Sequence, residues 1–151
     1  MTNRNEQKYP RRSIRLKGYD YSQAGAYFLT ICTHQRKIWL KNNASRQIIQ
    51  RIWNGLTDRY HQICLDEFII MPNHVHGIIW IITHTDKSSR TVVGAIHESP
   101  LHNKRKPRSL LSKIVGYFKM NTAKEINMLR GTPGTPFWQR GYYERVIRAE
   151  K

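Results

Sequence analysis

The sequence predicts an α+β fold in which two helices pack on one face of an antiparallel sheet. Three observations support this fold class. The length of 151 residues suits one domain, two segments repeat apolar residues at helical spacing, and short runs of β-branched and aromatic residues stand before, between and after them. Because the elements follow one another as β-α-β-β-α-β, the expected architecture is a ferredoxin-like sandwich.

The first strand is expected at residues 25–33, which are rich in aromatic and β-branched side chains. The first helix is expected at residues 44–60, where apolar residues recur every three or four positions. Asn42 or Asn43 can cap its first turn, because a side-chain amide oxygen accepts hydrogen bonds from the free N–H groups there.

A β-hairpin is expected next, because two apolar runs, residues 63–71 and 74–82, flank the turn-forming pair Pro72-Asn73. Both runs are apolar at odd and at even positions. This pattern predicts that both strands are central in the sheet and covered on both faces.

The second helix is expected to begin at Ser109 and to end at Arg130 and Gly131. Residues 137–148 are rich in aromatic and β-branched side chains and predict one or two short final strands. The domain then spans residues 25–148. A basic arm at residues 1–24 precedes it, and a basic loop without periodicity, residues 83–108, interrupts it.

The net charge is the strongest compositional signal, because 26 Lys and Arg residues stand against 10 Asp and Glu, which gives +16. An excess of this size indicates a polyanionic partner: DNA, RNA or an anionic membrane. Three basic clusters are expected to contact nucleic acid. They comprise Arg11, Arg12 and Arg15 in the arm, Lys104, Arg105, Lys106 and Arg108 in the loop, and Arg140, Arg145 and Arg148 in the final strand region.

A membrane partner is not expected. The longest apolar stretch, residues 77–82, is far shorter than the roughly 20 residues of a spanning helix, and the first residues show no signal-peptide pattern. Cys32 and Cys64 both lie in apolar runs, which predicts two buried thiols. Together these features predict a cytoplasmic, nucleoid-associated protein.

His74 and His76 are the pair whose spacing indicates chemistry. Side chains two positions apart on a strand point to the same face, so both imidazoles could reach one metal ion. The alternative is that they are simply two polar residues at the start of a strand. The spacing alone does not decide between a metal site and a structural role.

Longer strings give the pair its context. Residues 71–79 read MPNHVHGII and residues 138–148 read WQRGYYERVIR. Together with residues 9–36, they resemble the single-strand DNA transposases of the HUH class, in particular the REP-associated tyrosine transposases and their insertion-sequence relatives. The resemblance runs along nearly the whole chain, and it implies an HUH transposase-like domain with the ferredoxin-like fold and the H-x-H on a central strand.

The resemblance also implies a reaction. A divalent metal, Mg²⁺ or Mn²⁺, would be held by His74 and His76 with one further polar ligand and would polarise a scissile phosphate. A tyrosine would attack to give a 5′-phosphotyrosine link. The implied substrate is single-stranded hairpin DNA, and the resembled proteins include monomers and homodimers.

Three carboxylates are candidates for the third metal ligand. Glu67 comes first, because it lies on the strand expected to pair with the histidine strand, and Glu98 and Glu144 are the others. A solvent-facing or ion-paired role is the ordinary alternative for each.

The tyrosine nucleophile is expected beyond Lys151. In the resembled enzymes it lies on a helix after the W-Q-R strand, whereas only residues 149–151 follow here, too few for a helical turn. Tyr142 and Tyr143 lie beside arginines but are not expected to form the phosphotyrosine link. Two alternatives therefore stay open: a truncated, catalytically inactive derivative that still binds DNA, and an RNA-binding protein in which the H-x-H is incidental.

Overall fold

The computed structural model describes residues 19, 21, 23–82 and 108–148. These residues form the predicted order of elements, with one short addition after the first strand. The elements are β1 (Gly25–Cys32), the 3-10 turn η1 (His34–Arg36), α1 (Asn43–Asn54), α2 (Leu56–Arg59), β2 (Ile63–Met71), β3 (His74–Ile81), α3 (Leu110–Leu129) and β4 (Tyr143–Ile147).

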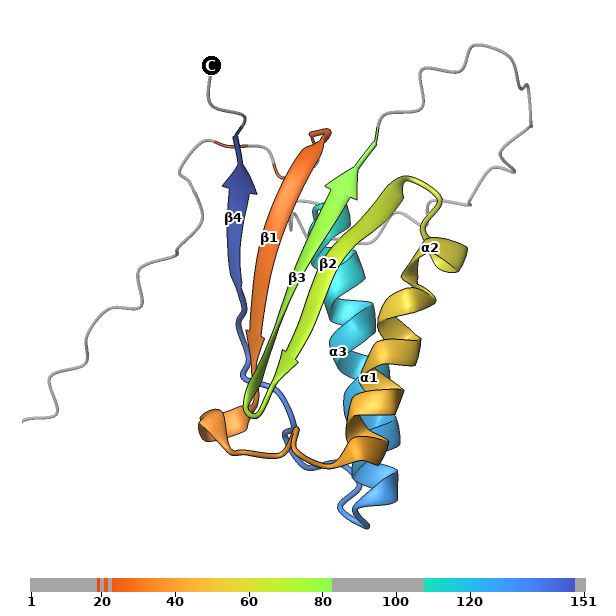
Figure 1. Cartoon of the computed structure of the whole chain (residues 1–151), viewed down its shortest axis with the longest axis vertical. Coiled ribbons are helices and arrows are strands. Elements are labelled where there is room, and N and C mark those ends of the chain that lie inside the picture. Colours follow the sequence, from red (N-terminus) through yellow and green to blue (C-terminus); the bar gives the residue numbers. More distant parts are fainter. Residues whose placement is uncertain (1–18, 20, 22, 83–107, 149–151) are drawn as a thin grey trace, which may run out of the picture.

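The four strands form one antiparallel sheet in the order β2-β3-β1-β4. Figure 1 shows α1 and α3 side by side along the same side of this sheet. This is the predicted ferredoxin-like arrangement, and β3, which carries the H-x-H, is an inner strand as expected. No helix in the described ranges combines the length and the apolar character that a bilayer crossing requires.

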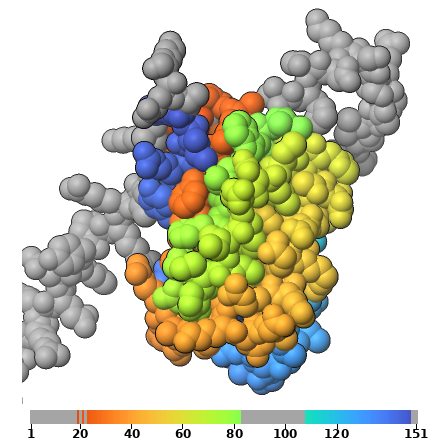
Figure 2. All heavy atoms as spheres, in the orientation of Figure 1, coloured from red at the N-terminus to blue at the C-terminus, as the bar shows by residue number. Residues whose placement is uncertain are grey.

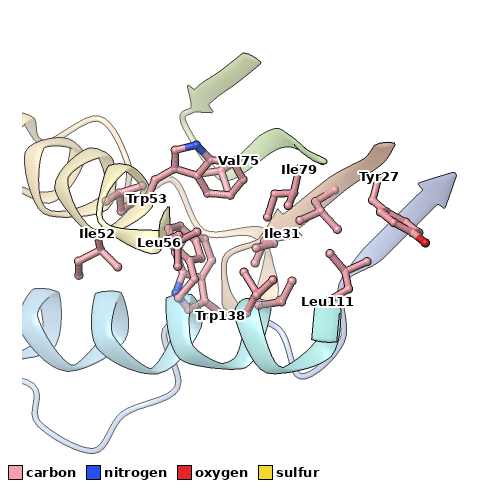
Figure 3. Packing of buried hydrophobic residues seen from close by; sticks show 14 of the residues in the cluster. Tyr27, Ile31, Ile52, Trp53, Leu56, Val75, Ile79, Leu111 and Trp138 are labelled. Atoms are coloured by element: carbon pink, nitrogen blue, oxygen red, sulfur yellow. The ribbon is translucent and has the colours of Figure 1, made fainter. Parts of the chain in front are cut away.

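The core lies between the sheet and the helices. Trp53 of α1, Ile79 of β3 and Leu111 of α3 are among its buried residues, and Figure 3 shows them converging from both layers. Trp53 stacks on Phe68 of β2 with ring centroids 4.2 Å apart and meets Phe118 of α3 edge-on. Aromatic contacts therefore join the two layers directly opposite the strand that carries the histidines.

The prediction that both hairpin strands are central and covered on both faces was wrong. β2 is an edge strand, and Ile69 and Trp80 remain 55% and 45% exposed on the face away from the helices. In Figure 2 the atoms of β2 and β3 reach the surface. We call this side, formed by the strand residues that alternate with the core residues, the open face. An apolar run does not reveal which of its two faces a helix covers.

The prediction of two buried thiols was also wrong, for the same reason. Cys32 is half-buried and Cys64 is exposed, because each is in register with an open-face residue of β3, His74 and Trp80 respectively.

The first helix begins as predicted and ends early. Asn42 caps it, since its Oδ1 accepts hydrogen bonds from the backbone N–H groups of Ala44 at 2.8 Å and Ser45 at 3.4 Å. The expected helix over residues 44–60 is instead two helices, α1 and α2, which meet at Gly55.

Gly77 of β3 lies under the indole of Trp53, and we expect Gly77→Ala to lower the free energy of unfolding by about 1–3 kcal/mol through overpacking. A Cβ there would collide with Cη2 of Trp53 and lie 2.7 Å from its Cζ2. Gly116→Ala is the matched control, because its position on α3 has open space around it and helix propensity predicts a gain of about 1 kcal/mol. Urea denaturation of both variants measures the difference. Equal stabilities would mean that Trp53 has room to move.

Candidate metal centre

His74 and His76 both lie on the open face. Their neighbours Val75, Gly77 and Ile79 are buried toward the helices, so the alternation along β3 leaves both imidazoles on the other side. The Nε2 atoms of the two rings are 3.0 Å apart and form a hydrogen bond with each other, and the rings meet edge-on with centroids separated by 4.6 Å. The two side chains thus converge on one point.

Each ring is held through its other nitrogen. Nδ1 of His74 lies 2.7 Å from Oδ1 of Asn73. Because an amide oxygen only accepts, the His74 Nδ1–H donates, and the neutral ring keeps the lone pair on Nε2. Nδ1 of His76 lies 2.9 Å from Oγ1 of Thr30 on β1, and Phe28 stacks on the same ring at 5.3 Å between centroids.

This geometry fits a pair of metal ligands. At a metal–ligand distance of about 2.1 Å, adjacent ligands of an octahedral ion, which lie at right angles, are about 3.0 Å apart, close to the observed Nε2 separation of 3.0 Å. Burial, followed by the electrostatic effects of His76 and Arg36, lowers the pKa of His74. A lowered pKa favours the neutral imidazole, which is the form that binds a metal. Metal-binding histidines commonly donate the other ring N–H to an oxygen acceptor, and His74 donates to Oδ1 of Asn73 in this way.

The candidate third ligands are not gathered around this pair. Glu67 is exposed on β2, where the pairing with β3 is irregular between Leu65 and Phe68. Glu144 is buried on β4 in register with Leu29, whose side chain faces the helices, so it lies on the other side of the sheet from the histidines. Glu98 lies outside the described residues. Within the described ranges no three His, Cys, Asp or Glu side chains come together as a potential metal site.

The two tyrosines of interest face opposite sides. The hydroxyl of Tyr142 lies 3.3 Å from Oγ of Ser112 on α3, on the helix side. Tyr143 is in register with Thr30, which is in turn in register with His76, so these three residues form one row across the open face.

The predicted nucleic-acid contacts that lie within the described residues are exposed. Arg145 is in register with Phe28 on the open face, and Arg108, Arg140 and Arg148 are exposed as well. The remaining predicted contacts, Arg11, Arg12, Arg15, Lys104, Arg105 and Lys106, lie outside the described residues.

The W-Q-R string that supported the resemblance has a structural role. Trp138 is buried, and its indole N–H donates to Oγ1 of Thr122 on α3 at 2.8 Å. The ammonium of Lys119, whose pKa burial lowers, donates to the carbonyl oxygens of Gln139 at 2.6 Å and Arg140 at 3.1 Å. These contacts fix the path of the chain as it enters β4.

Comparison with known proteins identifies the fold. No family model matches the sequence. A REP-associated tyrosine transposase bound to a REP hairpin has a similar structure, with a TM-score of 0.56 and 14% identity over 90% of this chain and 63% of that chain. A candidate transposase from Deinococcus radiodurans is also similar, with a TM-score of 0.51 and 15% identity over 89% of this chain and 87% of the other. This chain therefore has a fold found in transposases and spans less than two thirds of the length of the first.

A sequence relative defines the family. An uncharacterized protein of Haemophilus influenzae is 34% identical over 149 residues, which cover 93% of this chain and 81% of the relative. The chain belongs to the same family as that protein.

Proposed function

We propose that this protein nicks and joins single-stranded hairpin DNA in a transposase-type reaction, with a divalent cation, Mg²⁺ or Mn²⁺, held by His74 and His76. The observation that carries the proposal is the convergence of the two Nε2 atoms, 3.0 Å apart, on the open face of a fold that is similar to a transposase bound to a REP hairpin. The formal net charge of +16 supports a nucleic acid as the partner.

The chain's own residues would prepare the site for a phosphate. A bound divalent cation supplies a Lewis acid that polarises a phosphate oxygen. Asn73 accepts from Nδ1 of His74 and so leaves Nε2 unprotonated, while Thr30 fixes the ring of His76. Arg145, exposed on the same face, would bind other phosphate oxygens of the strand. The sheet would thus present both imidazoles and positive charge to one strand of DNA.

Incubation of the full-length protein with end-labelled hairpin DNA and Mn²⁺ tests the proposal. We expect nicked DNA and, where the protein tested includes the tyrosine nucleophile expected beyond Lys151, a covalent protein–DNA band that survives denaturation, because a phosphotyrosine link is covalent. Both products should disappear in His74→Ala and His76→Ala. The covalent band should persist in Tyr142→Phe and Tyr143→Phe, which retain the histidine pair.

Other results would contradict parts of the proposal. Tight DNA binding without nicking in Mg²⁺ or Mn²⁺ would contradict the enzymatic activity and indicate a DNA-binding derivative. Equal affinity for a single-stranded RNA of the same sequence would contradict the assignment of DNA as the substrate. Loss of the covalent band in Tyr143→Phe would show that the nucleophile lies on the open face itself.

A further inference from the structure

The turn that follows β1 has an unusual backbone. Gln35 and Arg36, in the 3-10 turn η1, have φ values of +53° and +54°. These values lie in the left-handed region, which is unfavourable for residues with a Cβ. Two such residues in succession persist only where the surrounding structure holds them, and such strain concentrates at functional sites.

The surrounding structure does hold this turn. Thr33, which is fully buried, donates from its backbone N–H to the carbonyl oxygen of Asn73 at 2.9 Å, and its Oγ1 lies 2.6 Å from the carbonyl oxygen of Lys37. The backbone N–H of His34 donates to the carbonyl oxygen of Phe137 at 2.8 Å. The turn is therefore fixed both to the β2–β3 hairpin and to the segment before β4.

One side chain connects this turn to the metal centre. Nδ2 of Asn73 donates to the carbonyl oxygen of Arg36 at 3.3 Å, and Oδ1 of the same amide accepts from His74. The single amide group of Asn73 therefore fixes the backbone of Arg36 and the imidazole of His74 relative to each other.

The charge of Arg36 has no counterpart in the described part of the chain. Its side chain is exposed, and within the described ranges no hydrogen bond or ion pair of its guanidinium is found. An exposed guanidinium without an acidic partner is available to bind an anionic ligand.

We propose that Arg36 binds the phosphodiester of the nucleic acid strand at the histidine pair, and that the strained turn exists to hold its guanidinium there. This inference rests on the proposed function and adds a phosphate-binding residue to it. A guanidinium suits the task because its planar set of N–H donors matches two phosphate oxygens at once. Asn73 would keep the backbone of Arg36 beside the imidazole of His74, so that the guanidinium can reach a phosphate at the histidine pair.

The test compares Arg36→Gln with Lys41→Gln in the full-length protein. Lys41 is an exposed cation between the turn and α1, so both variants lose one charge from the same stretch of surface. Fluorescence anisotropy with a single-stranded oligonucleotide in EDTA should show about ten- to a hundredfold weaker binding for Arg36→Gln. Lys41→Gln should change the affinity less than about threefold, as expected for an exposed charge. Arg36→Lys should lie between them, because lysine keeps the charge and loses the bidentate geometry.

A second measurement reports on the site itself. Addition of the dinucleotide thymidylyl-thymidine to the metal-free protein should shift the imidazole ¹⁵N resonances of His74 in the wild type and in Lys41→Gln, and leave them unchanged in Arg36→Gln. Equal behaviour of Arg36→Gln and Lys41→Gln in both measurements overturns the inference and leaves the proposed function in place. A wild-type protein that does not bind the oligonucleotide overturns both.

Discussion

His74→Ala and His76→Ala are each expected to abolish saturable Mn²⁺ binding while the protein stays folded. The two Nε2 atoms, 3.0 Å apart, are the proposed metal ligands, so either substitution leaves one imidazole. Removing a residue that only orients a metal ligand costs about 10–100-fold in metal affinity. Removing the ligand itself should therefore lower the affinity by more than about a hundredfold. Electron paramagnetic resonance of free Mn²⁺ measures the binding, and circular dichroism checks the fold.

Thr30→Val and Asn73→Ala test how much the residues that hold the two imidazoles contribute to metal affinity. Each removes the partner of one Nδ1 and keeps both imidazoles, so each should weaken Mn²⁺ binding by about 10–100-fold. Asn73→Asp keeps an acceptor for His74 and should lose less than Asn73→Ala. His61→Ala is the matched control, because His61 is exposed and lies before β2, away from the pair. An unchanged affinity in His76→Ala would show that Mn²⁺ binds elsewhere.

The sequence predicts much of this fold because the periodicity of its apolar residues is strong. The hairpin that carries the H-x-H lies at β2 and β3 within one residue of the expected bounds. The alternation along a strand also predicts that His74 and His76 share a face, and they do. These properties depend on neighbours in the sequence, which a pattern can report.

The rest of the site depends on contacts between distant residues. Thr30 holds His76 across 46 positions of sequence, and only the register of β1 on β3 brings them together. The Pro72-Asn73 pair predicts a turn. It does not predict that the Asn73 amide bonds both His74 and the backbone of Arg36. Similarly, Gly77 appears as an ordinary strand glycine until Trp53 is placed over it.

The open face explains why sequence and structure disagree about burial. Ile69 and Trp80 belong to apolar runs that resemble fully covered strands, yet both are exposed. A sheet face that binds a nucleic acid strand needs aromatic and apolar groups that stack on bases. If the open face binds a nucleic acid strand as proposed, its exposed apolar residues would produce the same sequence pattern as a second buried face. Trp80 fits this description, because it is exposed on the same face as the histidines. Its indole N–H donates to Oδ2 of Asp66 at 2.9 Å, which holds the ring in place.

Binding of single-stranded DNA is expected to weaken steeply as salt rises. Neutralising Z phosphates on a single strand gives a slope near −0.7Z for log K against log[salt]. A protein with a net charge of +16 that contacts about six phosphates should lose roughly two to three decades of affinity between about 50 and 200 mM salt. Anisotropy titrations at four salt concentrations measure the slope. A slope near zero would mean that base contacts, not phosphate contacts, dominate the affinity.

Two substitutions locate the phosphates that produce this slope. Arg145→Gln removes an exposed charge from the open face and should reduce the slope by about 0.7, the share of one phosphate contact. Lys124→Gln removes the same charge from α3, in the layer on the other side of the sheet. If only long-range attraction mattered, the two variants would have the same slope, because both lower the net charge by the same amount. A smaller slope in Arg145→Gln with an unchanged slope in Lys124→Gln would therefore place the DNA strand on the same face as the histidines. A smaller slope in Lys124→Gln alone would place the strand against the helices, away from the candidate metal centre.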